Sequence, residues 1–245
     1  MKKCLYLMLL FFKIVIQMEN LNELIEREDL KSMLEIAREF HGHICPYVAL
    51  GIKASVVAMK ELGVGRLGFN GSIEEEILAI VETNNCFTDG VQVATGCTLG
   101  NNSLIYLDLG KTALTLVKRG SWEGVRIYVD AERLRKYYPP EARELFEKVV
   151  KRREGSFDEK RRLGEVWEKT GYKMLGIPKE EFVITRVKVP PIEQAPIFES
   201  IRCSKCGELV MSTRIIYVDE KPLCIKCAGE SYHAVIGRGI VEVKK

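Results

Sequence analysis

Apolar residues recur along this chain in two patterns, one with helical spacing and one in short continuous runs. Between residues 30 and 40 the apolar positions lie three or four residues apart, which predicts an amphipathic helix. A second helix is predicted from Pro46 to residue 60 or 61, stopping at Gly63. Gly51 lies inside that helix, and close approach of another backbone or of a ligand would explain its missing side chain.

Three further helices follow from the same spacing. A short one is expected around 89–94, and a long one from about residue 157 to 175, ending at Gly176. Another begins at Glu141, and its apolar stripe consists of Ala142, Leu145, Phe146, Val149 and Val150.

Short apolar runs and alternating segments predict five strands, at 77–81, 104–107, 113–117, 125–129 and 183–189. The first is almost continuously apolar, which is typical of a strand buried on both faces. The second and third are separated by only a few residues that include Asp108, Gly110 and Lys111, so this connection is predicted to be a hairpin.

The 245 residues suit one domain of ordinary size with a small appendage. Pro190, Pro191 and Pro196 indicate a stiff linker. The predicted organisation is an apolar leader at 1–17, a core at 18–190, a linker at 191–200, and a metal-binding domain with its tail at 201–245.

The leader needs its own interpretation. Its apolar run is interrupted by Lys13, is followed by no small-residue cleavage site, and is shorter than the roughly 20 residues that span a bilayer. Met18 precedes a polar helical segment and is the preferred alternative start. A membrane anchor and a cleaved export signal are the alternatives.

Charge and cysteine usage narrow the function classes. The net charge of +3 is too small to indicate nucleic-acid binding by itself. Basic residues concentrate between 148 and 162 among glutamates, which indicates a solvated helix face or a surface for an anionic partner. Of the eight cysteines, four lie in CxxC pairs, one lies in the N-terminal apolar stretch, and three lie beside histidines or in glycine-rich turns. This arrangement suits metals in a reducing cytoplasm better than disulfides.

Four cysteines near the C-terminus have the spacing of a closed metal site. Cys203 and Cys206 form one CxxC pair, Cys224 and Cys227 form another, and 17 residues separate the pairs. The sequence between them suits a hairpin, and so short a segment needs the metal to fold. We expect structural zinc, with an iron centre or four unconnected thiols as the alternatives.

A second set of ligand types occurs early in the chain. His41, His43 and Cys45 lie within five residues, and Cys45 precedes Pro46 at the expected start of a helix, where a thiolate is stabilised. Cys97 is the first choice for a distant partner and Cys86 the second. This set predicts an open metal site or a reactive thiol. A purely structural role, holding helix ends by hydrogen bonds, is the alternative.

Several motifs together resemble the family of the E subunit of formylmethanofuran dehydrogenase. These are HGHICP followed by ALGIKA, then VETNNCFTDGVQVATGCTLGN, then DLGKTAL, and the C-terminal RCSKCGELVM and KPLCIKCAG are similar to the zinc finger that many members append. The core resemblance covers roughly residues 30–190. Tyr47 stands where members commonly have glycine, and Asn101 where a lysine is common.

The resemblance implies an α+β fold with a mixed or antiparallel sheet and packed helices, a homodimer, and a metal-containing cleft. The positions that match its motifs are His41, His43, Cys45, Cys86, Asp89, Gln92, Cys97, Asp108, Gly110 and Lys111. Molybdenum or tungsten chemistry belongs to other subunits of that enzyme, which are possible partners in a methanogenesis-related role.

Three functions are therefore expected in order. The first is a zinc-binding accessory or stand-alone relative of that E subunit, without a membrane partner. The second is a thiol- or metal-dependent enzyme of unknown substrate, in which Cys45, His43 and Asp89 are candidate catalytic residues. The third is a zinc-finger module for protein or nucleic acid, which the sparse basic and aromatic residues around the finger disfavour.

Overall fold

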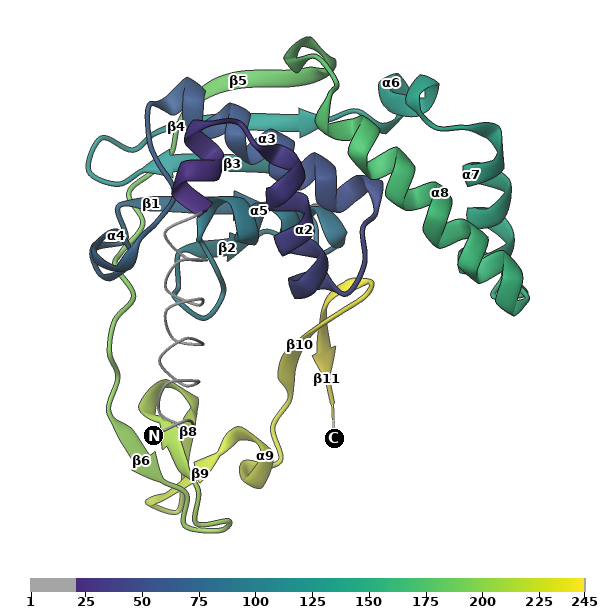
Figure 1. The fold of residues 1–245 in the computed structure, drawn as a ribbon. Helices are drawn as coiled ribbons and strands as arrows, with labels where there is room; N and C mark the ends of the chain where they lie inside the picture. The colour runs from purple at the N-terminus through teal and green to yellow at the C-terminus, as the bar shows by residue number, and fades with distance from the viewer. Residues whose placement is uncertain (1–20, 245) are drawn as a thin grey trace, which may run out of the picture. The chain divides into compact units, whose positions relative to one another are not determined.

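The computed structural model describes residues 21–244, so the predicted leader at 1–17 and the start at Met18 lie outside the described residues. The chain divides into two compact units, one up to Pro191 and one from Ile192 onwards. The first contains a five-stranded sheet with packed helices, and the second contains three small hairpins (Figure 1). The expected α+β fold with a small C-terminal metal-binding domain is confirmed.

The sheet of the first unit has the strand order β2-β1-β3-β4-β5. The bounds are β1 Ile77–Val81, β2 Leu104–Tyr106, β3 Ala113–Lys118, β4 Glu123–Val129 and β5 Phe182–Lys188. β1 pairs with β2 in parallel, and the other neighbours are antiparallel. The five predicted strands are all present within a few residues of these bounds.

The predicted hairpin between residues 104–107 and 113–117 is wrong. β1 lies between β2 and β3, with Ala79 opposite Leu104 on one side and Leu116 on the other. β1 is buried along its whole length, so it gains more as a central strand with two partners than as an edge strand. The segment with Asp108 and Lys111 therefore crosses over β1 to reach β3.

The helices of the first unit are α2 Leu30–His41, α3 Pro46–Leu62, α4 Phe69–Glu74, α5 Cys86–Thr95, α6 Ala131–Leu134, α7 Pro140–Leu145 and α8 Phe157–Leu175. Residues 21–26 are also helical, and the unit further contains two 3₁₀ turns, η1 Arg135–Tyr137 and η3 Lys179–Glu181, and a π-helical segment, η2 Phe146–Lys151. The sequence patterns identified α2, α3 and α8 closely. They missed α4 and α6, and they predicted one continuous helix where α7 passes into the wider π-helical turn of η2.

Local signals explain where several helices begin and end. The carboxylate of Asp29 accepts a hydrogen bond from the Ser32 amide at the start of α2, and Ser156 with Glu159 forms a capping box at the start of α8. Gly63 ends α3 in the left-handed conformation at φ 69°, which glycine adopts without strain.

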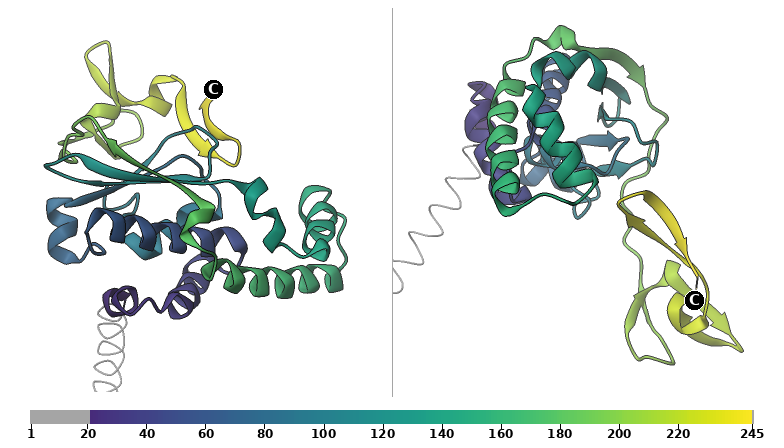
Figure 2. Two further views of the ribbon diagram at one scale, coloured as in Figure 1. Left: turned by 90° about the horizontal axis from the view of Figure 1, so that it is seen from above. Right: turned by 90° about the vertical axis from the view of Figure 1, so that its right-hand side faces the viewer.

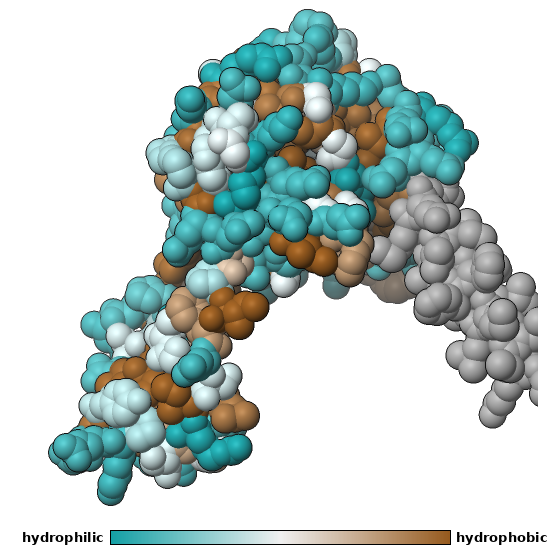
Figure 3. Space-filling view, turned by 90° about the vertical axis from the view of Figure 1, so that its left-hand side faces the viewer, coloured by the Kyte–Doolittle hydropathy of each residue, from teal (hydrophilic) through white to brown (hydrophobic). Residues whose placement is uncertain are grey.

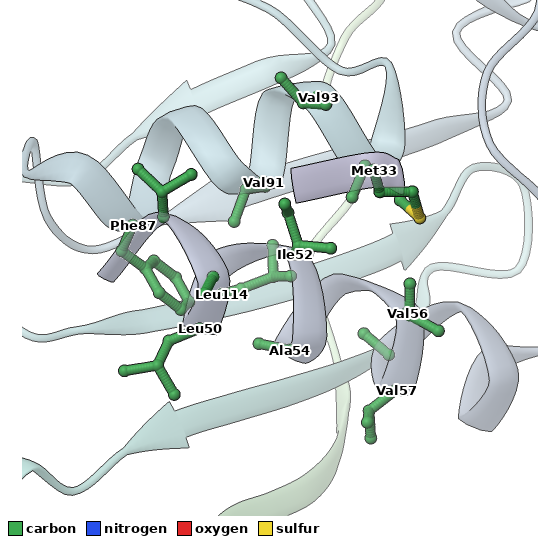
Figure 4. Packing of buried hydrophobic residues seen from close by; sticks show 14 of the residues in the cluster. Met33, Leu50, Ile52, Ala54, Val56, Val57, Phe87, Val91, Val93 and Leu114 are labelled. Atoms are coloured by element: carbon green, nitrogen blue, oxygen red, sulfur yellow. The ribbon is translucent and has the colours of Figure 1, made fainter. Parts of the chain in front are cut away.

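The main helices form a layer against one face of the sheet (Figure 2). Leu50 and Ile52 of α3, Phe87 and Val91 of α5, and Leu114 of β3 belong to one buried cluster, part of which is drawn in Figure 4. Hydrophilic residues cover most of the face of this unit that is seen in Figure 3. The hydrophobic core thus lies between the sheet and α3, with α5 beside α3.

Helices α3 and α5 approach each other through two glycines. A Cβ atom at Gly51 would lie 2.1 Å from the carbonyl oxygen of Phe87, and one at Gly90 would lie 2.2 Å from that of Val48. Both distances are far inside van der Waals contact, so neither position accepts a side chain without separating the helices. Of the two explanations for Gly51 that the sequence left open, the structure shows the approach of another backbone.

The basic stretch at 148–162 is paired with acidic side chains. Arg162 makes two hydrogen bonds to the Glu141 carboxylate, at 2.5 and 2.8 Å, and Lys148 lies 2.6 Å from Glu159. These exposed pairs link α7 and η2 to α8 and contribute little stability individually. These exposed ion pairs agree with the interpretation of this stretch as a solvated helix face.

The second unit consists of short strands and one helical turn. Its strands are β6 Ser200–Arg202, β7 Leu209–Met211, β8 Ile215–Val218, β9 Lys221–Cys224, β10 Tyr232–Ile236 and β11 Gly239–Val243, and its helix is α9 Ile225–Ala228. They pair as three antiparallel hairpins, β6–β7, β8–β9 and β10–β11. The tail, expected as a strand-like arm, is the hairpin β10–β11.

Replacing Gly51 with alanine tests the close packing of α3 and α5. We expect Gly51→Ala to lower the free energy of unfolding by about 1–3 kcal/mol or more, because the added methyl group overpacks the contact. Gly164→Ala is the matched control, since Gly164 is also inside a helix but an added Cβ there would meet nothing within 4 Å. That control should gain about 0.5–1 kcal/mol from helix propensity. Urea unfolding of both variants measures the difference, and equal stability of Gly51→Ala and wild type would contradict the packing argument.

Candidate metal centres

Four potential ligands of the first unit converge on one point. One ligand atom from each of His41, His43, Cys45 and Cys86 lies within 4.8 Å of the others. His41 is the last residue of α2, Cys45 caps the N-terminus of α3, and Cys86 is the first residue of α5. Three helix ends therefore supply the group, which we call the core site.

His41 is held by a carboxylate on the neighbouring helix. Its Nδ1 lies 2.6 Å from Oδ2 of Asp89, and the Gln92 amide donates to the other Asp89 oxygen at 3.0 Å. A carboxylate only accepts, so Nδ1 carries the proton in this contact, and in the neutral imidazole Nε2 has the free lone pair. This Nε2 is buried and has no hydrogen-bond partner in the part of the chain that the structure describes.

A buried imidazole nitrogen that lies beside two thiols and lacks a hydrogen-bond partner is suited to bind a metal ion. Metal-bound histidines commonly donate their other N–H to a carboxylate, which fixes the ring and raises its basicity. Two cysteine sulfurs and an imidazole are a donor set that zinc accepts. The residues present thus fit a metal ion, and Asp89, which contacts Nδ1 of His41, would orient that imidazole without being a ligand itself.

The two thiols differ in their electrostatics. The hydrogen bond with Cys86, together with burial, raises the pKa of Cys45 far above its usual range. The same hydrogen bond lowers the pKa of Cys86, to about 6, and the nearby His41 imidazole acts in the same direction. Both sulfurs lie at helix N-termini, where the partial positive charge of the helix favours a thiolate. One thiol of the pair is therefore prepared to ionise near neutral pH.

His43 occupies the outer side of the core site. Its ring lies 4.5 Å from that of His41 and stacks on Trp167 of α8 with 5.8 Å between centroids. Desolvation, with a smaller contribution from His41, lowers the pKa of His43. The imidazole is therefore neutral at pH 7 and able to accept a proton.

Cys97, the preferred distant partner in the sequence, does not join the core site, and the second choice Cys86 does. The Cys97 sulfur is fully buried and lies 3.8 Å from the carbonyl oxygen of Ile77, and burial raises its pKa to about 12. Cys86 begins α5 and Cys97 follows its end, so the ten-residue helix, about 15 Å long at 1.5 Å per residue, lies between them. The two cysteines cannot reach one ion.

The third sequence block also lies apart from the core site. The carboxylate of Asp108 accepts a hydrogen bond from the Tyr106 hydroxyl at 2.7 Å, and the Lys111 amide donates to the carbonyl of Glu82. Neither side chain belongs to the convergent group among residues 21–244. These residues shape the crossover between β2 and β3.

Two features of the core site carried no recognisable signal in the sequence. Gly171 of α8 packs so closely that a Cβ there would lie 2.7 Å from Ile44 and 3.4 Å from the Cys45 carbonyl oxygen. One turn earlier on the same helix, Trp167 stacks on His43. The sequence spacing places Trp167 and Gly171 on one face of the helix. It does not indicate that this face contacts the loop that contains Ile44.

The four cysteines of the second unit form another convergent group, with all sulfurs within 4.8 Å of one another. The Cys224 amide donates to the Cys203 sulfur at 3.3 Å, and the Cys227 amide donates to the Cys224 sulfur at 3.4 Å. Backbone amides of Cys206 and Cys224 lower the pKa of Cys203 to about 6. Such N–H to sulfur contacts stabilise thiolates, so the group fits a tetrahedral metal ion.

Fold and sites together define a metal-binding α+β protein with an appended zinc-finger domain. Residues 40–184 match the family described as “FmdE, Molybdenum formylmethanofuran dehydrogenase operon”, and residues 196–233 match the “Prokaryotic dksA/traR C4-type zinc finger”. The first match covers more than half of the chain, and the chain belongs to the FmdE family. The family resemblance seen in the sequence motifs is confirmed.

A solved structure and a curated protein extend this result. The fold is similar to that of a tungsten formylmethanofuran dehydrogenase FmdE-like protein from Syntrophus aciditrophicus, with a TM-score of 0.53 and 28% identity over 82% of this chain and 92% of that chain. A protein of Archaeoglobus fulgidus named “Probable S-adenosyl-L-methionine-binding protein” is 63% identical over 213 residues. That alignment covers 87% of this chain but only 57% of the relative, so the chain spans little more than half of the relative's length.

The finger can be tested by removing one sulfur. We expect Cys206→Ser to lower the zinc content by about one equivalent and to expose the 201–229 segment to protease, because the small hairpins have no other core. Ser204→Ala, in the same turn, is the control and should keep both the metal and the protection. Metal analysis and limited proteolysis give the two readouts. Unchanged zinc content with a protected segment would show that these cysteines do not hold the ion.

Proposed function

We propose that the core site binds one metal ion, zinc, through His41, Cys45 and Cys86. The observation that carries this proposal is the buried Nε2 of His41, which faces the thiols without a hydrogen-bond partner among the described residues while Asp89 holds the other nitrogen. Leaving such a group unsatisfied costs roughly 1–3 kcal/mol, which a metal ion at this position would offset. A second zinc ion in the finger has a structural role.

Three protein ligands leave room for a ligand from outside, which distinguishes this site from the closed finger. A zinc ion held in this way would act as a Lewis acid toward a bound molecule. His43, neutral and stacked on Trp167, is in position to accept or return a proton beside it. Asp89 is a positioning residue, not an acid or base, since its carboxylate is occupied by His41 and Gln92.

At the level of the cell, we propose an accessory or stand-alone member of the FmdE family that works in the cytoplasm as a homodimer. Family membership supports association with other formylmethanofuran dehydrogenase subunits and a methanogenesis-related role. Among the described residues, no helix is both long enough and apolar enough to cross a bilayer. A thiol- or metal-dependent enzyme using Cys45 is the second candidate, favoured by the open side of the core site and the proton acceptor His43.

Metal analysis of cysteine variants tests the core site directly. The full-length chain should contain two equivalents of zinc, and Cys86→Ser should contain one, because two remaining ligands hold zinc poorly. Cys97→Ala is the control and should retain both equivalents, since its sulfur is not part of the site. Circular dichroism confirms that each variant is folded. Two equivalents in a folded Cys86→Ser chain would rule out this ligand set.

The role of Asp89 gives a separate test. Asp89→Asn should weaken zinc binding at the core site by about 10–100-fold, because loss of the carboxylate lowers the basicity of His41 and releases its orientation. Competition with a chelator, in a Cys206→Ser background that removes the finger ion, measures this affinity. Asp108→Asn is a matched control outside the site and should leave it unchanged. Equal affinities in the two variants would contradict a positioning role.

A further inference from the structure

A cavity of about 530 Å³ opens beside the core site, and the cysteines of the site form part of its wall. Cys45 and Cys86 lie at one side, next to Asn85. Much of the remaining lining comes from the segment between β4 and α8, which contains α6, η1 and α7. The volume lies within the range of clefts that hold small organic molecules.

The charged side chains that line the cavity are all positive. Arg135 of η1 and Arg143 of α7 both line the cavity, and no aspartate or glutamate is among the lining residues. Neither guanidinium group has an ion pair or hydrogen bond to another described residue, in contrast to nearby Arg162, which is paired with Glu141. Two guanidinium groups in the lining of one cavity offer charged donors that suit a carboxylate or phosphate.

The remaining wall is aromatic. Tyr47, Tyr138, Phe146 and Trp167 line the cavity, and the rings of Phe146 and Trp167 lie 6.1 Å apart. Burial raises the pKa of both tyrosines, whose side chains are half-buried. Such walls suit a flat or apolar body, which stacks or packs against ring faces. Phe146 begins the π-helical segment η2, a feature frequent at functional sites.

We propose that this cavity binds a small organic anion. Its carboxylate or phosphate group contacts Arg135 and Arg143, its flat body lies among the aromatic side chains, and its far end reaches Cys45 and Cys86. The orientation of that far end toward a metal ion rests on the proposed function, whereas binding of the anion does not. The core site would thus act on a molecule that the arginines select by charge.

Trp167 provides a direct readout of occupancy. The chain has two tryptophans, so the Trp122→Phe variant leaves Trp167, in the cavity wall, as the only reporter. Phenyl phosphate and benzoate are the anionic probes, and benzyl alcohol is the uncharged probe of similar size. We expect saturable quenching by the anions and much weaker binding of the alcohol, and the tighter anion identifies phosphate or carboxylate as the preferred group.

Arginine variants in this background locate the anion. Arg135→Gln and Arg143→Gln should each weaken the tighter anion about ten-fold or more, as expected for loss of a charged hydrogen bond. Arg133→Gln is the control, because it removes the same charge from the same segment but donates to the Glu180 carbonyl and does not line the cavity. Its affinity should remain within about two-fold of the parent.

The outcomes separate the two proposals. Absence of quenching, equal binding of benzyl alcohol, or equal weakening in Arg133→Gln would overturn the anion site. Zinc content is measured on the same preparations and should be the same in all arginine variants. A chain that binds the anion but holds no zinc in its core refutes only the metal site, and one that holds zinc but binds neither anion refutes only the cavity ligand.

Discussion

The contact between α3 and α5 at Gly51 and Gly90 is the constraint on which the core site depends. Because neither residue has a side chain, the backbones meet directly, with hypothetical Cβ positions only 2.1 and 2.2 Å from facing carbonyl oxygens. The crossing lies about five residues from each helix N-terminus, so it also brings Cys45 and Cys86 together. Two helix dipoles then point their positive ends at the same pair of sulfurs, which favours a thiolate and a cation bound to it.

The two candidate metal centres bring their ligands together at different levels of structure. In the finger, the four sulfurs come from two CxxC turns within one short segment, and the ion replaces a hydrophobic core. In the core site, the ligands come from three helix ends, and Asp89, Gln92 and Trp167 fix the imidazoles from neighbouring elements. A local site closes around its ion, whereas a site at the meeting point of helices can keep one side open.

The cavity beside the core site is lined in part by the segment between β4 and α8, which is not among the sequence motifs that carry the family resemblance. Its arginines and aromatic residues complete a cavity whose other wall is the core site. Tyr47 and Cys45, which belong to the first sequence motif, also line this cavity. Differences in this segment would change which molecule fits while the ligands, fixed by α3 and α5, stay in place.

The sequence by itself determined most of the helices and strands and the four cysteines of the finger. Periodicity placed α8 and β1 at their observed bounds, and CxxC spacing picked out the four cysteines that lie together in the finger, because both depend on residues close together in the chain. Only the tertiary structure decided that β1 separates β2 from β3, that Cys86 and not Cys97 reaches Cys45, and that Arg135 and Arg143 line the same cavity as Cys45 and Cys86. These outcomes depend on which buried surfaces pack together over long separations, and local spacing contains no information about that choice.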